Sequence, residues 1–162
     1  QKEFGSVLVF CSKKQNVKAL SRELKRAKFS IEEIHSDLLQ EQREQVLIDF
    51  KNKRLKILVA TDLLSRGIDI EDIDLVINYD VPNDGEDYVH RIGRTARAAS
   101  EGTAYTFITE KEQQKFARIE KLLGHEVTKA KVPEQFGDTP AYSPRTTRPE
   151  QRRRFSGKPN RR

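Results

Sequence analysis

Short apolar runs alternate along the chain with segments in which apolar residues recur every three or four positions. The runs are rich in β-branched and aromatic residues and predict buried strands at 6–11, 31–35, 56–61, 73–79 and 102–108. The spaced segments predict amphipathic helices at 13–27, 40–52, 84–92 and 110–123. Near-continuous apolar strands that alternate with helices indicate a parallel sheet covered on both faces.

Polar residues at the start of two predicted helices have the spacing of a capping box, in which a side chain caps the first turn. The pairs are Ser12 with Gln15 and Thr109 with Glu112. Gly124 stands where a glycine commonly ends a helix. The last predicted helix carries the apolar residues Phe116, Ile119, Leu122 and Leu123.

Polar residues also follow several predicted strands directly. Ser12 follows the first strand, Thr61 and Asp62 close the third, and Asp80 follows the fourth. In parallel α/β sheets, ligands bind at the carboxyl ends of the strands. We therefore expect one functional edge that gathers these residues.

The regular pattern ends near Val127, and proline and arginine become frequent beyond it. We predict a folded domain over 1–126, a connecting segment over 127–136 and a disordered tail over 137–162. Residues 137–162 hold eight basic and two acidic side chains, whereas the 23 basic and 23 acidic residues of 1–136 balance. A tail that holds the whole net charge of +6 suggests a polyanionic partner, although solubilising tails and protein-binding tails share this composition.

Composition excludes several classes of protein. No apolar run approaches the ~20 residues that a membrane-spanning helix needs. The single Cys11 rules out an internal disulfide framework and fits a reducing compartment, so we expect a cytoplasmic protein. Cys11 and the histidines His35, His90 and His125 lack the spacing of metal ligands, so no metal site is expected. A chain without Met that begins at Gln1 is expected to be part of a longer protein.

Residues 88–97 read Tyr-Val-His-Arg-Ile-Gly-Arg-Thr-Ala-Arg and place Arg91, Arg94 and Arg97 three positions apart. A guanidinium binds phosphate oxygens through paired hydrogen bonds and stays charged near neutral pH. The adjacent Gly93 would let the backbone turn sharply or approach a partner closely. The three arginines suit a multiply charged oxyanion, but on charge pattern alone a solvated basic helix face is the more common explanation.

The segment at 90–97 resembles motif VI of the DEAD-box RNA helicases. Other motifs of that family are matched in the family's order. They are motif IV at 7–12, the Q-x-x-R element at 35–43, motif V at 60–69 and the short element after it at 76–80. Ala96 and Ser36 stand where the family usually has Gly. The residues of motif VI favour DEAD-box proteins over DNA helicases of the same superfamily. The short basic tail is similar to that of bacterial members of the family.

The resemblance implies a RecA-like three-layer α/β/α domain with a mainly parallel sheet. It implies the second motor domain of an ATP-dependent RNA helicase, whose partners are single-stranded or duplex RNA and an N-terminal RecA-like domain. ATP and Mg²⁺ would be held mainly by that first domain, because residues 1–162 contain neither a phosphate loop nor an Asp-Glu-Ala-Asp segment. The chain alone should therefore be inactive. The alternative is a non-enzymatic RNA-binding or scaffold module that kept the fold.

The resemblance also assigns roles at the nucleotide. Arg94 and Arg97 correspond to arginine fingers, which stabilise charge on the transferred phosphoryl group. Asp69 resembles the acid that contacts the ATP ribose, although a plain loop acid would look the same. His90 and Arg91 are similar to residues that couple the nucleotide site to the first domain.

Four residues are implied at the RNA backbone: Gln40, Arg43, Thr61 and Arg66. Thr61 could instead cap the turn that follows its strand. Arg43 could be a helix-surface charge paired three or four positions away. Two neighbouring residues have structural explanations, since Cys11 reads as a small buried apolar residue and His35 as a structural histidine.

Overall fold

A computed structural model describes residues 3–62, 70, 72–95 and 102–144. Its strands are β1 (Val7–Phe10), β2 (Ile31–Ile34), β3 (Ile57–Ala60), β4 (Leu75–Asn78) and β5 (Thr103–Thr106). Its α-helices are α1 (Lys14–Arg26), α2 (Gln40–Lys51), α3 (Gly85–Ile92) and α4 (Gln113–Leu123). Short 3-10 turns lie at Gly93–Thr95, Glu110–Glu112 and Glu134–Phe136. Within the described ranges, no helix is both long enough and apolar enough to cross a membrane.

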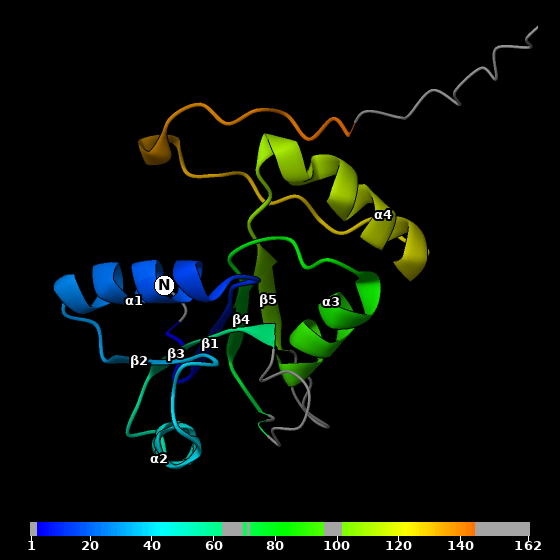
Figure 1. The fold of residues 1–162 in the computed structure, drawn as a ribbon. Helices are drawn as coiled ribbons and strands as arrows, with labels where there is room; N and C mark the ends of the chain where they lie inside the picture. Colours follow the sequence, from blue (N-terminus) through cyan, green and yellow to red (C-terminus); the bar gives the residue numbers. More distant parts are fainter. Residues whose placement is uncertain (1–2, 63–69, 71, 96–101, 145–162) are drawn as a thin grey trace, which may run out of the picture.

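The five strands form one parallel sheet in the order β2-β3-β1-β4-β5 (Figure 1). At its centre, Val9 lies opposite Val59 on one side and Ile77 on the other. The predicted strands and the predicted parallel sheet are confirmed. Each strand is shorter than the apolar run that predicted it, because the outer residues of each run continue into the connecting loops.

Helices cover both faces of the sheet. On one face, α1 places Val17 against Val9 and Val59. On the other face, α2 packs Phe50 into a cluster with Leu8 and Leu58. The remaining two helices, α3 and α4, pack on each other beside β4 and β5, where they share a third apolar cluster (Figure 1). The chain therefore has the three layers expected from its sequence.

One prediction about helix ends is wrong and two are confirmed. The residue that precedes α1 is Lys13, not Ser12, and it makes no side-chain cap; Ser12 is directed elsewhere, as described below. Thr109 and Glu112 form the predicted capping box, with the Thr109 hydroxyl 2.6 Å from the Glu112 carboxylate. Gly124 ends α4 with a φ of 74°, a left-handed conformation that favours glycine. Of the apolar residues on α4, Phe116 and Ile119 are buried, whereas Leu122 is 65% exposed.

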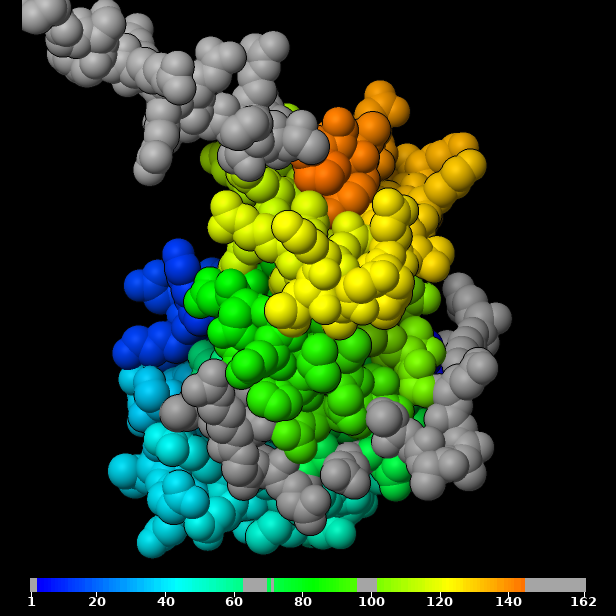
Figure 2. All heavy atoms as spheres, turned by 90° about the vertical axis from the view of Figure 1, so that its right-hand side faces the viewer, coloured from blue at the N-terminus to red at the C-terminus, as the bar shows by residue number. Residues whose placement is uncertain are grey.

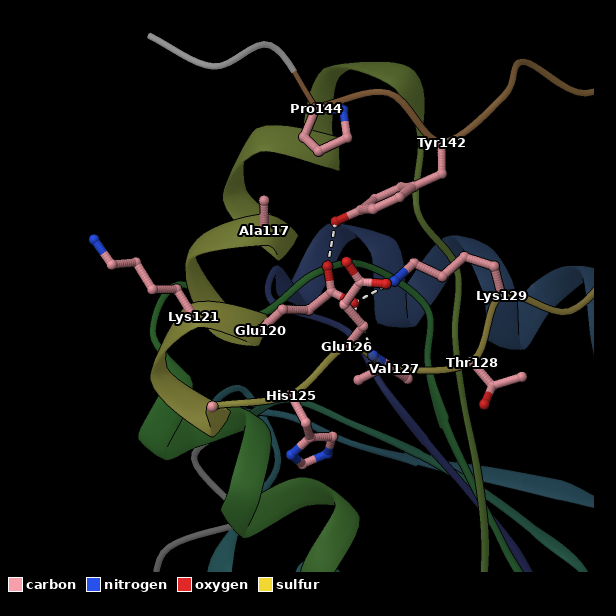
Figure 3. A pocket seen from close by; sticks show the side chains of 11 residues that line it. Ala117, Glu120, Lys121, His125, Glu126, Val127, Thr128, Lys129, Tyr142 and Pro144 are labelled. Atoms are coloured by element: carbon pink, nitrogen blue, oxygen red, sulfur yellow. Dashed lines mark hydrogen bonds and ion pairs between the residues drawn. The ribbon is translucent and has the colours of Figure 1, made fainter. Parts of the chain in front are cut away.

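Residues 127–143, here called the strap, fold back over α4. The Glu120 carboxylate accepts hydrogen bonds from the Val127 N–H at 2.8 Å, from the Tyr142 hydroxyl at 2.7 Å and from the Lys129 ammonium (Figure 3). The Tyr142 ring also meets Phe116 edge to face, with ring centroids 6.3 Å apart.

The end of the strap is held by a second pair of hydrogen bonds. The Gln113 amide donates to the Ala141 carbonyl at 2.9 Å and accepts from the Ser143 N–H at 2.8 Å. Figure 2 shows this orange part of the chain resting against the yellow-green α4. Contacts with α4 therefore continue to Ser143, past Gly137, where the sequence predicts the disordered tail to begin, although residues 130–141 are exposed.

Candidate functional site

The carboxyl ends of β1, β3 and β4 meet at one edge of the sheet, around the side chain of Arg91. Arg91 comes from α3 and is fully buried. Its guanidinium donates two parallel hydrogen bonds to the Asp62 carboxylate, at 2.5 Å from Nε and 2.7 Å from Nη2. Asp62 follows β3, so this bidentate pair fastens α3 to the end of a central strand.

The remaining donors of Arg91 reach the two neighbouring strands. Nη1 donates to the Asn78 side chain at 3.3 Å and to the Asp80 carbonyl at 3.2 Å, both at the end of β4. Nη2 lies 3.3 Å from the Ser12 hydroxyl, just after β1. The guanidinium also lies over the Phe10 ring, 5.4 Å from its centroid. One side chain therefore joins the ends of three strands.

Ser12 and Asp80 close the network between β1 and β4. The Ser12 N–H donates to the Asp80 carboxylate at 2.9 Å, and the Ser12 hydroxyl also donates to it. This explains why Ser12 does not cap α1. Sequence analysis placed Ser12 and Asp80 at the expected edge but did not pair them, since a contact between residues 68 positions apart leaves no local signal.

Arg94 lies beyond this buried network, in a tight turn. Helix α3 ends at Ile92, and the 3-10 turn Gly93–Thr95 changes the direction of the chain. The Arg94 carbonyl accepts the Ile73 N–H at 3.2 Å, which fixes the turn while the Arg94 side chain stays partly exposed. His90, on the last turn of α3, is exposed. The basic segment thus divides into one buried arginine and two residues at the surface.

The turn that carries Arg94 also depends on Gly102. A Cβ at Gly102 would lie 2.1 Å from the Thr95 carbonyl oxygen and 2.3 Å from the Thr95 Cβ, both impossible contacts. Thr95 is buried, and its hydroxyl donates to the Ile92 carbonyl at 3.0 Å. Only glycine lets β5 start this close to the turn. Sequence analysis did not single out Gly102.

Two of the four predicted RNA-contacting residues lie on α2, and a third follows β3. Arg43 donates from Nη2 to the Ser36 carbonyl at 3.1 Å, and its buried Nε has no hydrogen-bond partner among the described residues. Arg43 is therefore not paired along its own helix, whereas Gln40 is, with Glu44 at 2.7 Å. The Thr61 N–H donates to the Ile34 carbonyl at 3.3 Å, which keeps Thr61 beside the loop after β2.

Several predicted residues lie outside the described residues: Arg66, Asp69, Ala96 and Arg97. Arg91, predicted at the nucleotide, has its guanidinium enclosed by Asp62, Asn78 and Ser12. The role implied for Arg91 at the nucleotide stays a prediction. Of the other described cations of the segment, His90 is exposed and Arg94 is partly exposed.

Cys11 and His35 have the structural positions expected of them. Burial, followed by the nearby Asp80 charge, raises the pKa of the Cys11 thiol to about 12, so it is not a thiolate nucleophile. His35 is buried and accepts the Asp37 N–H at 3.2 Å through Nδ1. Among the described residues, no three His, Cys, Asp or Glu side chains are grouped to hold a metal ion.

These features define a class of protein: a parallel α/β domain that presents basic side chains at the carboxyl edge of its sheet. Residues 1–99 match the family model described as "Helicase conserved C-terminal domain". The chain belongs to this family and is the C-terminal helicase domain found in DEAD-box RNA helicases.

Proteins from distant organisms share this domain. The chain is 45% identical over 130 residues to the ATP-dependent RNA helicase DbpA of Bacillus subtilis, covering 80% of this chain and 27% of that protein. It is 46% identical over 134 residues to the DEAD-box ATP-dependent RNA helicase 40 of Oryza sativa, covering 83% and 16%. Because the relatives include bacterial, plant and human proteins, they do not support the expected bacterial origin.

Solved structures confirm the RecA-like fold. A DEAD box protein from Methanococcus jannaschii superposes with a TM-score of 0.75 at 45% identity, covering 81% of this chain and 36% of that one. Dbp5 of S. cerevisiae, bound to RNA and ADP BeF3, gives 0.71 at 33% identity, covering 76% and 33%. The chain spans about a quarter of the DbpA protein and about a third of these two structures.

Proposed function

We propose that this chain is the second motor domain of an ATP-dependent RNA helicase, acting with an N-terminal RecA-like domain on single-stranded or duplex RNA in the cytoplasm. It supplies arginine fingers to a nucleotide held mainly by that first domain, and it supplies half of the RNA groove. The two domains then close over ATP and RNA, and closure separates a short duplex locally. The chain alone turns over no ATP.

The observation that supports this proposal best is the fixed turn that carries Arg94. The Arg91 network holds the strand ends, and the Ile73-to-Arg94 backbone bond holds the turn itself. Arg94 is thereby presented from a rigid edge, as stabilisation of a transition state requires. On the same edge, Arg43 and Thr61 flank the loop after β2, where an RNA backbone would pass.

ATP and Mg²⁺ fit this chain only in part. Arg94 and the sequence-assigned Arg97 would face the γ-phosphate, and Asp69 would face the ribose. When bound, ATP would supply the phosphoryl group that is transferred, and Mg²⁺ would neutralise part of its charge. The residues of this chain stabilise the charge on the transferred phosphoryl group. The catalytic base and the Mg²⁺ ligands belong to the other domain.

The test is an Arg94→Ala substitution in the whole protein. RNA-stimulated ATP hydrolysis should fall about a thousandfold, whereas ATP binding should change little, because a finger acts mainly in the transition state. Arg94→Lys should restore little, since a point charge cannot reproduce the guanidinium fork. The matched control is Arg118→Ala on the exposed face of α4, which should hydrolyse ATP normally.

Near-normal turnover in Arg94→Lys would contradict the finger assignment. ATP turnover by the 162-residue chain alone would contradict the two-domain proposal. RNA binding without any RNA-stimulated hydrolysis in the unmodified whole protein would favour the scaffold alternative.

A further inference from the structure

A second basic site lies away from the predicted RNA groove, between α1 and the edge strand β2. The two elements run side by side at one end of the sheet (Figure 1). They enclose a pocket of about 480 Å³. The residues that line it are Lys18, Ser21, Arg22, Lys25, Arg26 and Glu33. Four of the six are cations, in a domain whose first 136 residues have no net charge.

The cations follow the geometry of the helix. Lys18, Arg22 and Arg26 are four positions apart and therefore form one ridge along α1, with successive side chains about 6 Å apart. Three of the four cations already have acidic partners: Lys18 with Asp37, Lys25 with Glu32 and Arg26 with Glu23. Arg22 is exposed, and the described part of the chain offers it no acid.

Two polar atoms at the pocket have no partner among the described residues. They are the hydroxyl of Ser21, whose residue is only 2% exposed, and the buried Oε2 of Glu33. The other carboxylate oxygen of Glu33 lies 3.7 Å from the His35 Nε2. Buried polar atoms are nearly always hydrogen-bonded, so each of these two atoms indicates a missing partner.

The two sets of atoms require different chemistry from the same ligand. An exposed guanidinium beside lysines suits a phosphate. A carboxylate oxygen and a serine hydroxyl that line the same pocket suit a neutral hydroxyl, which can donate to Glu33 and accept from Ser21. Free phosphate would offer no hydrogen-bond donor to the Glu33 carboxylate, and its negative charge would repel that carboxylate. A ribose 2′-hydroxyl next to its own phosphate has both groups, and it distinguishes RNA from DNA.

The pocket is also connected to the predicted groove. Arg43 binds the Ser36 carbonyl, and the adjacent Asp37 accepts Lys18 at 2.7 Å and Lys14 at 2.9 Å. The hydrogen bonds from Lys18 and Lys14 hold the pKa of Asp37 well below its usual value, so this junction stays ionised. Arg43 contacts Ser36, and Lys18, the first residue of the basic ridge, contacts the adjacent Asp37. An RNA strand that passes Arg43 would therefore come close to the start of the ridge.

We propose that the pocket between α1 and β2 binds one ribose-phosphate unit of RNA outside the main groove. Arg22 contacts the phosphate, and Glu33 with Ser21 contacts the 2′-hydroxyl. This inference rests on the proposed function as an RNA helicase. Long strands therefore gain a contact that short strands cannot reach.

The test compares single-stranded oligouridine strands of 20 and 6 nucleotides, and a 20-nucleotide strand of 2′-deoxyuridine, binding to the whole protein. Arg22→Glu should weaken the long RNA about tenfold, lower its salt slope by about 0.7, and leave the short RNA unchanged. Glu33→Gln should bind the deoxy strand normally but lose part of the preference for RNA. The control is Arg118→Glu, the same charge reversal on exposed α4.

Thermal midpoints equal to that of the unmodified protein would show that the variants are folded. Equal weakening by Arg22→Glu and Arg118→Glu would overturn the inference, as would a loss that includes the 6-nucleotide strand. An unchanged preference for RNA in Glu33→Gln would overturn the 2′-hydroxyl contact. Failure of the proposed function would look different, because the unmodified protein itself would then show no RNA-stimulated hydrolysis.

Discussion

A guanidinium sealed from water is stable only when its donors are paired. Arg91 meets this condition through a carboxylate, an amide, a carbonyl and a hydroxyl from three strand ends. The desolvation cost of such a buried charge is large, so the ion pair with Asp62 adds little net stability to the fold. Once Arg91 is buried, however, loss of the pair would destabilise the fold strongly. At the scale of the residue, Arg91 thus sets the geometry from which Arg94 is presented.

Arg91→Ala should therefore lower the free energy of unfolding by about 3–5 kcal/mol, because it leaves the Asp62 carboxylate without its partner. Asp62→Asn should also destabilise, and the double variant should lose less than the sum of the two. Urea denaturation of the 162-residue chain measures all three values. Arg118→Ala, at an exposed position, should stay within about 0.5 kcal/mol of the unmodified chain. Strict additivity of Arg91→Ala and Asp62→Asn would argue against the network.

The sequence allowed Ser12, Asp62 and Asp80 to be placed at one edge of the sheet, since each follows a predicted strand. The sequence did not show that Arg91 is buried and Arg94 partly exposed, because regular spacing alone does not distinguish their exposure. Their difference comes from Asp62 and from the end of α3, which are tertiary and local-geometry effects. Burial of a charged side chain depends on partners that no periodic pattern reveals.

At the scale of the element, the strands and helices were predictable because each has a regular apolar period. The strap has none. Its position depends on single contacts, from Tyr142 and Val127 to Glu120 and from Ser143 to Gln113. A segment that is held by a few specific hydrogen bonds resembles a disordered tail in sequence. This is why the predicted tail begins at Gly137, before the packed residues end.

The strap should be closed only within a window of pH. Burial raises the pKa of Glu120, but hydrogen bonds from Lys129, Tyr142 and Val127 outweigh it and lower that pKa below its ordinary 4.5. A depressed carboxyl pKa stabilises the strap above about pH 4.5, and this contribution is lost as the pH falls further. Burial, with the hydrogen bond to Glu120, raises the pKa of Tyr142 above its ordinary 10.0. That contribution is present below pH 10 and is lost at more alkaline pH.

Hydrogen exchange at the Val127 and Ser143 amides measures this opening directly. Both amides should be protected at neutral pH and lose protection together in acid, ahead of the β1 amides. Tyr142→Phe should reduce their protection at neutral pH about tenfold, the effect of one hydrogen bond to a charged group. Tyr105→Phe, on the exposed face of β5, is the matched control and should change neither amide. Unaltered protection in Tyr142→Phe would show that the hydroxyl does not hold the strap.

At the scale of the whole molecule, charge is divided between a neutral domain and a basic tail. The residues beyond Pro144 contain all eight tail cations and one acid. Ser143, which stands just before the tail, is held on α4 by its hydrogen bond to Gln113.

Deleting residues 145–162 tests the role of the tail, and it spares the whole strap, whereas a deletion from Gly137 would remove the part of the strap from 137 to 143. For single-stranded RNA, the logarithm of affinity falls with the logarithm of salt concentration at about −0.7 per phosphate contact. Full engagement of the eight cations would contribute about −5 to −6, and we expect only part of it because eight separate phosphate contacts rarely form at once. The deletion should flatten the salt dependence and weaken RNAs of different sequence similarly, while the thermal midpoint barely moves. RNA titrations at several salt concentrations, with the intact and the shortened chain, measure this. An unchanged slope would show that the tail does not contact RNA and would make a protein the better candidate for its partner.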